Sequence, residues 1–451
     1  MAKLQEKTKK EQVSSQNPQY GRPRAGAAIR EPRMTAVESP TSINSGRVRE
    51  KKRDLAVKRE SVSSPAVRKT KEEIIRTRGG VDRVMLSLIL ILLALGSIMV
   101  FSASYPSALA KEGDSMYYIK RQLLFSAVGI VLMIAASFVP LSWYKFLAPF
   151  VFGFATLLLI IVLIPGIGIS NGEARRWLGL KGTPFTFQPS EMMKFALVMM
   201  LAWYLNKYRD QVLDRSDRKK TFIWGALIPS GFVGVACLLV LLEKHLSGTV
   251  IMGFIGLAVM IVGGVHLGWM ASIVGVGGSV AVGLFLAMNP YALQRILTFT
   301  DENADKLDEA WQTTQGLLAI GSGGLLGVGL GASRQKYSYV SEAQNDFIFT
   351  IWCEEMGFVG AIALILLFLF FVWRGYVIAM RAPDIFSCLL VMGIICQVGI
   401  QAFLNIAVVA DVVPNTGIAL PFFSYGGTSL IILLAEMGVV LAVSKHSYQK
   451  K

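Results

Sequence analysis

The chain has little of the chemistry that redox enzymes and transition-metal proteins use. It contains four cysteines and three histidines in 451 residues, and 17% of its residues are charged against 53% hydrophobic. The cysteines lie in apolar segments without paired spacing, so we interpret them as small buried hydrophobic residues. No His, Cys and carboxylate spacing indicates a transition-metal site, and no motif indicates an organic cofactor. The shortage of charge excludes a soluble domain and indicates a polytopic membrane protein.

Residues 1–80 lack long apolar runs and have almost no aromatic side chains. They hold 20 Lys or Arg and 9 Asp or Glu, a net charge of +11. Such a segment cannot bury enough apolar surface to offset chain entropy, so we expect a disordered basic tail that stays attached and cytoplasmic. It is either a solvated arm attracted to anionic lipid or a docking segment for a cytoplasmic partner. Nucleic-acid binding is not expected, because no aromatic residues interleave with the charge.

Apolar windows of about twenty residues predict an all-α fold with about ten transmembrane helices. The windows are 84–105, 122–140, 144–164, 192–206, 222–242, 248–264, 268–289, 347–373, 384–410 and 419–444. Ten spans place both chain ends on one side, and the six Lys or Arg of Lys207–Lys220 favour the cytoplasm for that side. We therefore expect a tail at 1–80, a membrane domain at 81–445 and a short cytoplasmic end at 446–451.

The loop at 291–346 then lies outside, and it is far longer than a connection between two helices requires. Its first part is acidic, with carboxylates at Asp301, Glu302, Asp305, Asp308 and Glu309. A carboxylate near apolar surface has a raised pKa and can act as a general base, although spacing alone does not select one of the five.

The second part of the loop is rich in glycine and ends in ionic residues. Six glycines within eleven residues, 321–331, permit close backbone approach to a ligand or to another helix, and the lysine of a nucleotide-binding loop is absent. Arg334 and Lys336 follow. Acids come next, at the membrane boundary and within the following span, and we expect them to face the protein interior or a wet cavity. They are Glu342, Asp346, Glu354 and Glu355.

Two further polar clusters are predicted at the outer ends of spans. Glu191 and Lys194 follow a helix-start proline and share one helix face, and Arg176 lies just upstream. This cluster is either an interfacial ion pair or a grip on an anionic headgroup. His245 lies between two spans and is either a hydrogen-bonded interface residue or a ligand; a divalent cation bridging a carboxylate and a substrate phosphate is a further possibility here.

The last motif, 413–429, has two prolines and three glycines where the chain enters a span. It predicts an irregular, re-entrant turn, which is tolerated at membrane depth only where it lines protein or water.

Together these motifs resemble the SEDS family of bacterial envelope proteins, which contains FtsW, RodA and SpoVE. The resemblance covers nearly all of 84–444 and is carried by NGEARRW, FQPSEMMK, EKHLSGT, AWQTTQ, AIGSGGLLGVGLGASRQKYSYVSEAQNDFIF, EEMGFVG and PNTGIALPFFSYGGTSL. HLSGT and the SRQKY run are more similar to the division and sporulation branch than to the elongation branch. The resemblance implies a ten-helix peptidoglycan glycosyltransferase that polymerises lipid II at the outer face of the bacterial cytoplasmic membrane during cell division. It also implies a class B penicillin-binding protein as transpeptidase partner, and other divisome proteins.

The family's catalytic aspartate precedes an aromatic-Gln-x-x-Gln motif, here Trp311–Gln315, and counting back as in the family gives Asp305. Lys306 stands where the family usually has Pro, and Asp301 and Asp308 are the neighbouring candidates. The expected substrate-binding residues are Arg176, Glu191, Lys194, His245, Gln312, Gln315, Arg334, Lys336, Glu342, Asp346 and Ser424, with Mg or Mn as the candidate divalent cation. A lipid II flippase and a non-enzymatic divisome scaffold are the alternative functions.

Overall fold

The computed structural model describes residues 80–171, 174–179, 186–214, 216–279, 311–337 and 339–447, with isolated positions between 282 and 293. The predicted tail and Asp301, Asp305 and Asp308 lie outside the described residues. The helices and strands are α2 (Arg83–Glu112), α3 (Tyr117–Phe138), α4 (Leu141–Leu163), β1 (Ile169–Asn171), β2 (Ala174–Gly179), β3 (Thr186–Phe187), α5 (Pro189–Lys207), α6 (Arg209–Leu213), α7 (Arg218–Lys220), the π-helix η1 (Thr221–Leu227), α8 (Ile228–Leu242), α9 (Leu246–Val262), α10 (Leu267–Ile273), the π-helix η2 (Val274–Gly278), α13 (Trp311–Ser322), α14 (Ile348–Met380), α15 (Ile385–Val409) and α16 (Gly427–Lys445).

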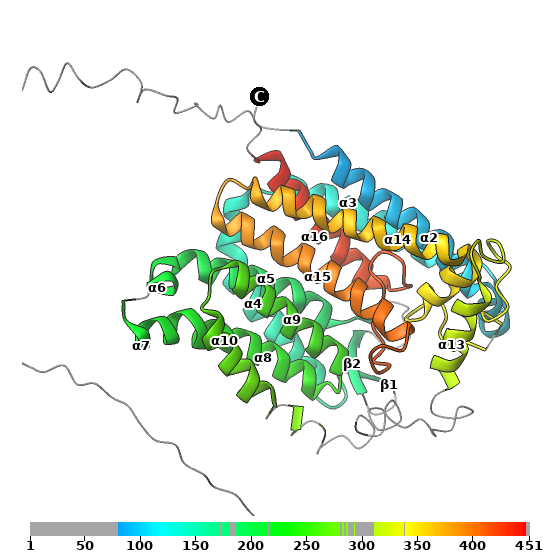
Figure 1. Cartoon of the computed structure of the whole chain (residues 1–451), viewed down its shortest axis with the longest axis horizontal. Coiled ribbons are helices and arrows are strands. Elements are labelled where there is room, and N and C mark those ends of the chain that lie inside the picture. Colours follow the sequence, from blue (N-terminus) through cyan, green and yellow to red (C-terminus); the bar gives the residue numbers. More distant parts are fainter. Residues whose placement is uncertain are drawn as a thin grey trace, which may run out of the picture. The chain divides into compact units, whose positions relative to one another are not determined.

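Each of the ten predicted windows contains helix, which confirms the all-α membrane fold (Figure 1). Within the described residues, seven helical stretches are long and apolar enough to cross a membrane: α2, α3, α4, Arg218–Leu242, α14, α15 and α16. The stretches Leu246–Val262 and Leu267–Gly278 are apolar but shorter. α5 is long enough at 19 residues, but Glu191 and Lys194 make it too polar to count among the seven.

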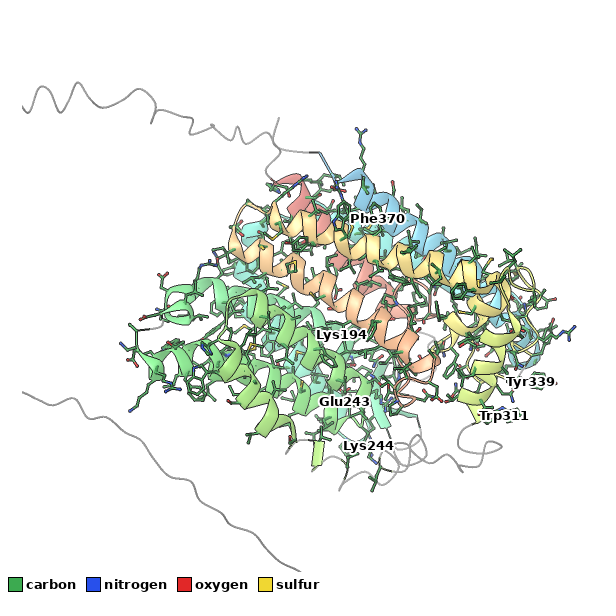
Figure 2. The ribbon with its side chains drawn as sticks, viewed as in Figure 1. Lys194, Glu243, Lys244, Trp311, Tyr339 and Phe370 are labelled. Atoms are coloured by element: carbon green, nitrogen blue, oxygen red, sulfur yellow. The ribbon has the colours of Figure 1, made fainter. Side chains whose placement is uncertain are left out.

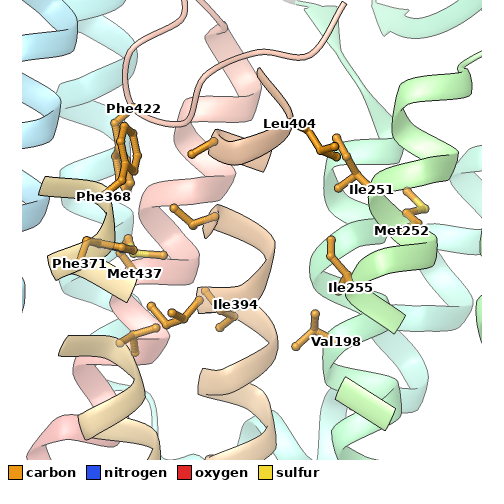
Figure 3. Packing of buried hydrophobic residues seen from close by; sticks show 14 of the residues in the cluster. Val198, Ile251, Met252, Ile255, Phe368, Phe371, Ile394, Leu404, Phe422 and Met437 are labelled. Atoms are coloured by element: carbon orange, nitrogen blue, oxygen red, sulfur yellow. The ribbon is translucent and has the colours of Figure 1, made fainter. Parts of the chain in front are cut away.

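The polar helix α5 is tolerated because protein surrounds it. It packs against α4, α8, α9 and α15, so its side chains meet other helices on most sides. Val198 on α5 lies near Ile255 on α9 and Ile394 on α15 in the core (Figure 3). The peripheral helix α4, by contrast, exposes an apolar stripe with near-helical spacing at Phe146, Phe150, Phe154 and Leu157. That stripe is the surface a membrane span presents to lipid acyl chains.

A small antiparallel sheet, absent from the helical prediction, precedes α5. Its strand order is β1-β2-β3, and Asn171 pairs with Ala174, so only two residues connect the first two strands. These two residues are Gly172 and Glu173, and glycine at the first position of a two-residue connection is a hairpin signal that the sequence contains. The sheet carries Arg176 at the same end of the bundle as the turn between α8 and α9.

The glycine-rich segment packs against a break in α14, where Gly357 has φ 67°. On one side of the break, the carbonyl groups of Glu354 and Glu355 accept hydrogen bonds from Val328 and Gly329, each at 3.0 Å. On the other, the amides of residues 358 and 359 donate to the carbonyls of residues 324 and 325 at 2.9 and 3.1 Å. Of the two expected uses of these glycines, the structure therefore has close approach to a helix.

Candidate active site at one end of the helical bundle

The predicted pair of Glu191 and Lys194 lies in the first two turns of α5. Pro189 occupies the first helical position, where its missing amide hydrogen is not needed. The Lys194 Nζ is 2.9 Å from the Glu191 Oε2, which confirms the shared helix face. Lys194 is 3% exposed, so this ion pair belongs to the interior of the bundle.

A polar cavity of about 30 Å³ adjoins this pair, between α5, α15 and α16. The Lys194 Nζ donates to the Gln401 Oε1 at 3.0 Å, and the Gln401 Nε2 donates to the Ala419 O at 2.9 Å. Glu436, which is 1% exposed, accepts from the Gln397 Nε2 at 2.9 and 3.2 Å. The cavity has room for about one water molecule.

Ser424 also lines this cavity and links it to the end of the large loop. Its Oγ accepts from the Leu420 N and donates to the Asn345 O, both at 2.7 Å. One residue further, the Asp346 O accepts from the Asn405 Nδ2 of α15 at 2.7 Å. The stretch between α15 and α16 is non-helical and lies against protein, as the sequence predicts.

The helix α13 is pinned to the same region through its first turn. The Trp311 Nε1 donates to the Tyr339 O at 3.0 Å (Figure 2). The Gln312 Nε2 donates to the Ser341 O at 3.0 Å, while its Oε1 accepts from the Asn415 Nδ2 at 3.2 Å. Gln315, in the next turn, is buried. The Trp-Gln-x-x-Gln motif is thereby attached to the 411–426 segment as well as to its own loop.

The β2 strand and the turn between α8 and α9 supply the remaining wall. The guanidinium of Arg176 donates to the carbonyl of Lys244, and the hydroxyl of Ser247 donates to the carbonyl of Thr416. Because Asn415 is next in the chain to Thr416, these bonds continue into the contacts of α13. The hairpin, the α8–α9 turn and the α13 motif thus form one connected polar surface at one end of the bundle.

His245 lies within this wall as a hydrogen-bonded residue. Its Nδ1 is 3.4 Å from the Gln188 Nε2 and 3.5 Å from the Ser190 Oγ, at the start of α5. Burial, together with the positive charges of Arg176 and Lys194, lowers the pKa of His245 to about 3. The imidazole is therefore neutral at physiological pH and connects the α8–α9 turn to the first turn of α5.

Glu243, two residues before His245, is 1% exposed, and neither carboxyl oxygen has a hydrogen-bond partner among the described residues. Burial raises its pKa to about 8, and the nearby charge of Arg176 opposes that shift only in part. A carboxyl group without hydrogen bonds in such a place is most stable when it is protonated. Figure 2 shows Glu243 and Lys244 in the turn beside the sheet.

Lys336 does not belong to this surface, because the residue is buried, with 4% of its area exposed. Its Nζ contacts the Gly331 O at 2.7 Å, the Glu355 Oε1 at 3.1 Å and the Ser102 Oγ at 3.2 Å. The neighbouring Arg334 has an exposed side chain, and its backbone amide donates to the Glu354 Oε1 at 2.9 Å. The two cations predicted as a pair therefore lie in different surroundings, and Lys336 has a structural contact set.

The predicted acids also differ in burial. Glu354 and Glu355 are 2% and 1% exposed, which confirms that they face the interior. Glu342 is a correction, because its side chain is 52% exposed and forms a 3.4 Å ion pair with Lys111. It lies in the loop before α14 begins, where water can solvate it.

Sequence reasoning missed the residues that complete the cavity wall, namely Gln397 and Gln401 on α15 and Glu436 on α16. A lone acid inside an apolar span costs several kcal/mol in lipid, so Glu436 carried a signal that could have identified it. The glutamines carried no comparable signal, because an amide in a helical span is common enough to need no partner of a particular kind.

The similarity to known proteins extends over the whole membrane part of the chain. Residues 82–449 match the model of a family described as cell cycle proteins, which covers FtsW, RodA and SpoVE. Stage V sporulation protein E of Bacillus subtilis (strain 168) is 39% identical over 371 residues, 81% of this chain and 97% of the relative. A probable peptidoglycan glycosyltransferase FtsW of Geobacter sp. (strain M18) is 37% identical over 368 residues, with coverage of 81% and 97%.

Solved structures agree with this placement. The crystal structure of the rod shape determining protein RodA of Thermus thermophilus has a TM-score of 0.59 and 28% identity, covering 82% of this chain and 98% of that one. A chain from a peptidoglycan synthase complex, described as coordinating polymerization and crosslinking, has a TM-score of 0.64 and 26% identity, with coverage of 82% and 99%.

Proposed function

The chain belongs to the family of cell cycle proteins that includes FtsW, RodA and SpoVE, and from that premise we propose that it is a peptidoglycan glycosyltransferase. Its reaction is the polymerisation of lipid II into glycan strands at the outer face of the bacterial cytoplasmic membrane. The observation that carries the proposal is the connected polar surface at one end of a helical membrane bundle, with the small Lys194 cavity between α5, α15 and α16 beside it. A lipid-linked sugar phosphate needs this juxtaposition of apolar helices and polar groups.

In the proposed reaction Asp305 is the general base. Its carboxylate takes the proton of the 4-hydroxyl of the acceptor sugar, and that oxygen bonds to the anomeric carbon of the donor. The bond between the anomeric carbon and the pyrophosphate oxygen breaks, and polyprenyl pyrophosphate leaves with the electron pair. A pyrophosphate leaves as a stable anion, so a second carboxyl group as acid catalyst is not required.

In this proposal cations stabilise the developing pyrophosphate charge. Their exposure and hydrogen bonds indicate which of them can reach the substrate. Arg334 is the best placed, because its side chain is exposed while the loop backbone beneath it is anchored to Glu354. Lys194 serves the cavity, where Glu191 and Gln401 hold its ammonium group in place. Lys336 positions the loop that carries Arg334, since its own ammonium group is engaged in the interior.

A divalent cation remains a separate proposal. Among the described residues no three His, Cys, Asp or Glu side chains are placed to hold a metal ion, and we derive no step through one. Chelation followed by addition of Mg or Mn to a polymerisation assay measures whether one is required.

The proposed partner is a class B penicillin-binding protein, which crosslinks the strands that this chain makes. The similarity to a chain from a peptidoglycan synthase complex supports it. The proposed orientation has both chain ends and Lys207–Lys220 in the cytoplasm, and the 39% identity to a sporulation protein together with the similarity to FtsW supports the division and sporulation branch.

The test is lipid II polymerisation by the purified full-length protein, alone and with the transpeptidase. Asp305→Asn is expected to reduce the rate by roughly 10²–10⁴, the usual contribution of a general base. Asp301→Asn and Asp308→Asn are the matched controls, each removing one charge from the same acidic run, and both are expected to keep most of the rate. An Asp305→Asn protein with the parental rate overturns the assignment. If that protein also moves labelled lipid II across proteoliposomes, a flippase is favoured.

A further inference from the structure

A second cavity, of about 360 Å³, lies where α2 begins and where α14 and α16 end. This is the opposite end of the bundle from β1, β2 and α13, as the helices in Figure 1 show. Its wall includes the first residues of the described chain, 80–84, and the ends of the two later helices at Arg374, Arg381 and Ser447. None of these residues belongs to the candidate active site.

One side of the cavity is held rigid by Asp82. Its carboxylate accepts two bonds from Arg374, at 3.1 and 2.5 Å, and a third from the Met85 amide at 2.8 Å, which caps α2. Its own amide donates to the Ser444 Oγ at 3.1 Å. These bonds join the start of α2 to α14 and α16, so the cavity wall is preorganised.

The charge of the cavity is positive. The lining contains a single acid, Asp82, against the three guanidinium groups of Arg83, Arg374 and Arg381. The paired Arg374 offsets Asp82, while the side chains of Arg83 and Arg381 are exposed. Two exposed arginines that line a cavity suit a phosphoryl group, because each guanidinium group can donate two hydrogen bonds to its oxygens.

The surroundings identify the depth at which this cavity lies. On α14, Arg374, Ile378 and Arg381 line the cavity, while the adjoining face exposes Phe370, Trp373 and Tyr376 at 43%, 53% and 47%. The Phe370 and Trp373 rings stack with centroids 5.5 Å apart, and Figure 2 labels Phe370. Tyr376 lies in the last two turns of α14 and Trp373 just before them, and exposed Trp and Tyr near the end of a span mark the level of the lipid headgroups.

We propose that this cavity binds the phosphodiester headgroup of an anionic phospholipid. Arg83 and Arg381 hold the phosphate oxygens, Arg374 stays paired with Asp82, and the acyl chains lie against the apolar faces of α2 and α14. A basic pocket between helix ends at the headgroup level is a recurrent way to retain such a lipid. A free phosphate has the same oxygen chemistry, but it would leave the exposed apolar rim beside the cavity uncovered.

The experiment is native mass spectrometry of the full-length protein in detergent, titrated with phosphatidylglycerol or phosphatidylcholine. The wild-type chain is expected to retain one phosphatidylglycerol at least roughly tenfold more tightly than the Arg83→Gln/Arg381→Gln protein, which loses two charge-assisted contacts. Lys219→Gln/Lys220→Gln is the matched control, because it removes two exposed charges on α7, outside the cavity. It is expected to bind phosphatidylglycerol as the wild type does.

Several results overturn the proposal. Equal weakening in both double variants means that only bulk charge attracts the lipid. Equal retention of phosphatidylcholine means that the headgroup charge is not recognised, and displacement of phosphatidylglycerol by low millimolar inorganic phosphate assigns the site to a soluble anion. Melting temperatures of all three proteins, measured without added lipid, establish that the double variants are folded.

Discussion

Two lysine–glutamate ion pairs inside this protein differ in how many hydrogen-bond acceptors surround the ammonium group of the lysine. Lys336 donates to three acceptors. Its partner Glu355 also accepts from the Ser102 hydroxyl, which lies 2.6 and 2.8 Å from its two carboxylate oxygens, and from the Ser333 amide. Lys194 has two acceptors of its own among the described residues, Glu191 and Gln401, and it adjoins a cavity. An ammonium group has three donors, so the first pair is saturated while the second retains capacity for a ligand or water. We interpret the lysine whose three donors are all used as a structural residue, and the lysine with a donor left as part of a binding site.

The saturated pair is expected to give the largest effect when it is broken. Lys336→Met leaves the Glu355 carboxylate buried without its counter-charge, which costs about 3–5 kcal/mol of unfolding free energy. Thermal unfolding in detergent measures the loss, and Lys336→Met/Glu355→Gln is expected to recover part of it because the orphaned charge is gone. Lys111→Met is the control, since it breaks an exposed pair and is expected to change little.

The glycine segment around Glu355 is the next target. A Cβ at Gly327 would overlap the Glu355 carbonyl, and φ is 81° there, so Gly327→Ala is expected to cost roughly 2–4 kcal/mol. Gly321→Ala, in the open part of α13, is the matched control and is expected to be neutral or stabilising. Equal melting temperatures for the two variants would contradict the close approach of loop and helix.

The unsaturated pair is expected to respond in activity more than in stability. Lys194→Met should reduce lipid II polymerisation by roughly tenfold or more, since it removes a preorganised positive charge beside the substrate path. Its melting temperature should fall less than that of Lys336→Met, because water in the cavity can solvate Glu191. Lys120→Met, at an exposed ion pair, controls for the loss of one charge. If the Lys194→Met protein has a much lower melting temperature but the parental polymerisation rate per folded molecule, Lys194 is a structural residue like Lys336.

Glu243 extends the comparison to a carboxyl group with no hydrogen bond among the described residues, and its effect is expected in the pH dependence of stability. Its folded pKa of about 8 lies above the ordinary 4.5, so the folded state keeps a proton that the unfolded state has lost. Stability therefore falls as pH rises from 4.5 to 8, by about 1.4 kcal/mol per unit. His245, whose lowered pKa acts only below 6.5, does not contribute between pH 6.5 and 8.

The measurement is the melting temperature between pH 6.5 and 8 in wild type and Glu243→Gln. The wild-type value should decline across the window, and the variant should show a flatter profile. A decline of equal slope in both proteins would mean that another group titrates.

The sequence was sufficient for features that repeat along one helix. Apolar runs predicted the spans, and the three-residue spacing predicted the contact between Glu191 and Lys194. It was not sufficient where distant segments meet: Ser102 and Glu355 are 253 residues apart, so nothing local distinguishes Lys336 from the exposed Arg334. The family resemblance supplied Asp305, which lies outside the described residues and stays a prediction. The polar wall built from Gln397, Gln401 and Glu436 depends on which helix faces become neighbours, and that is decided by packing.

The break at Gly357 also bears on the chain entropy of the glycine-rich segment. Glycine loses more conformational freedom on folding than other residues, so a run of them is usually the first part of a fold to open. Here four backbone hydrogen bonds tie 324–329 to both sides of the break. Opening the segment therefore exposes buried backbone on α14 as well. Amide exchange at 328, 329, 358 and 359 should be slow and concerted. The glycine-rich segment is therefore expected to be held rigidly against α14 despite its composition.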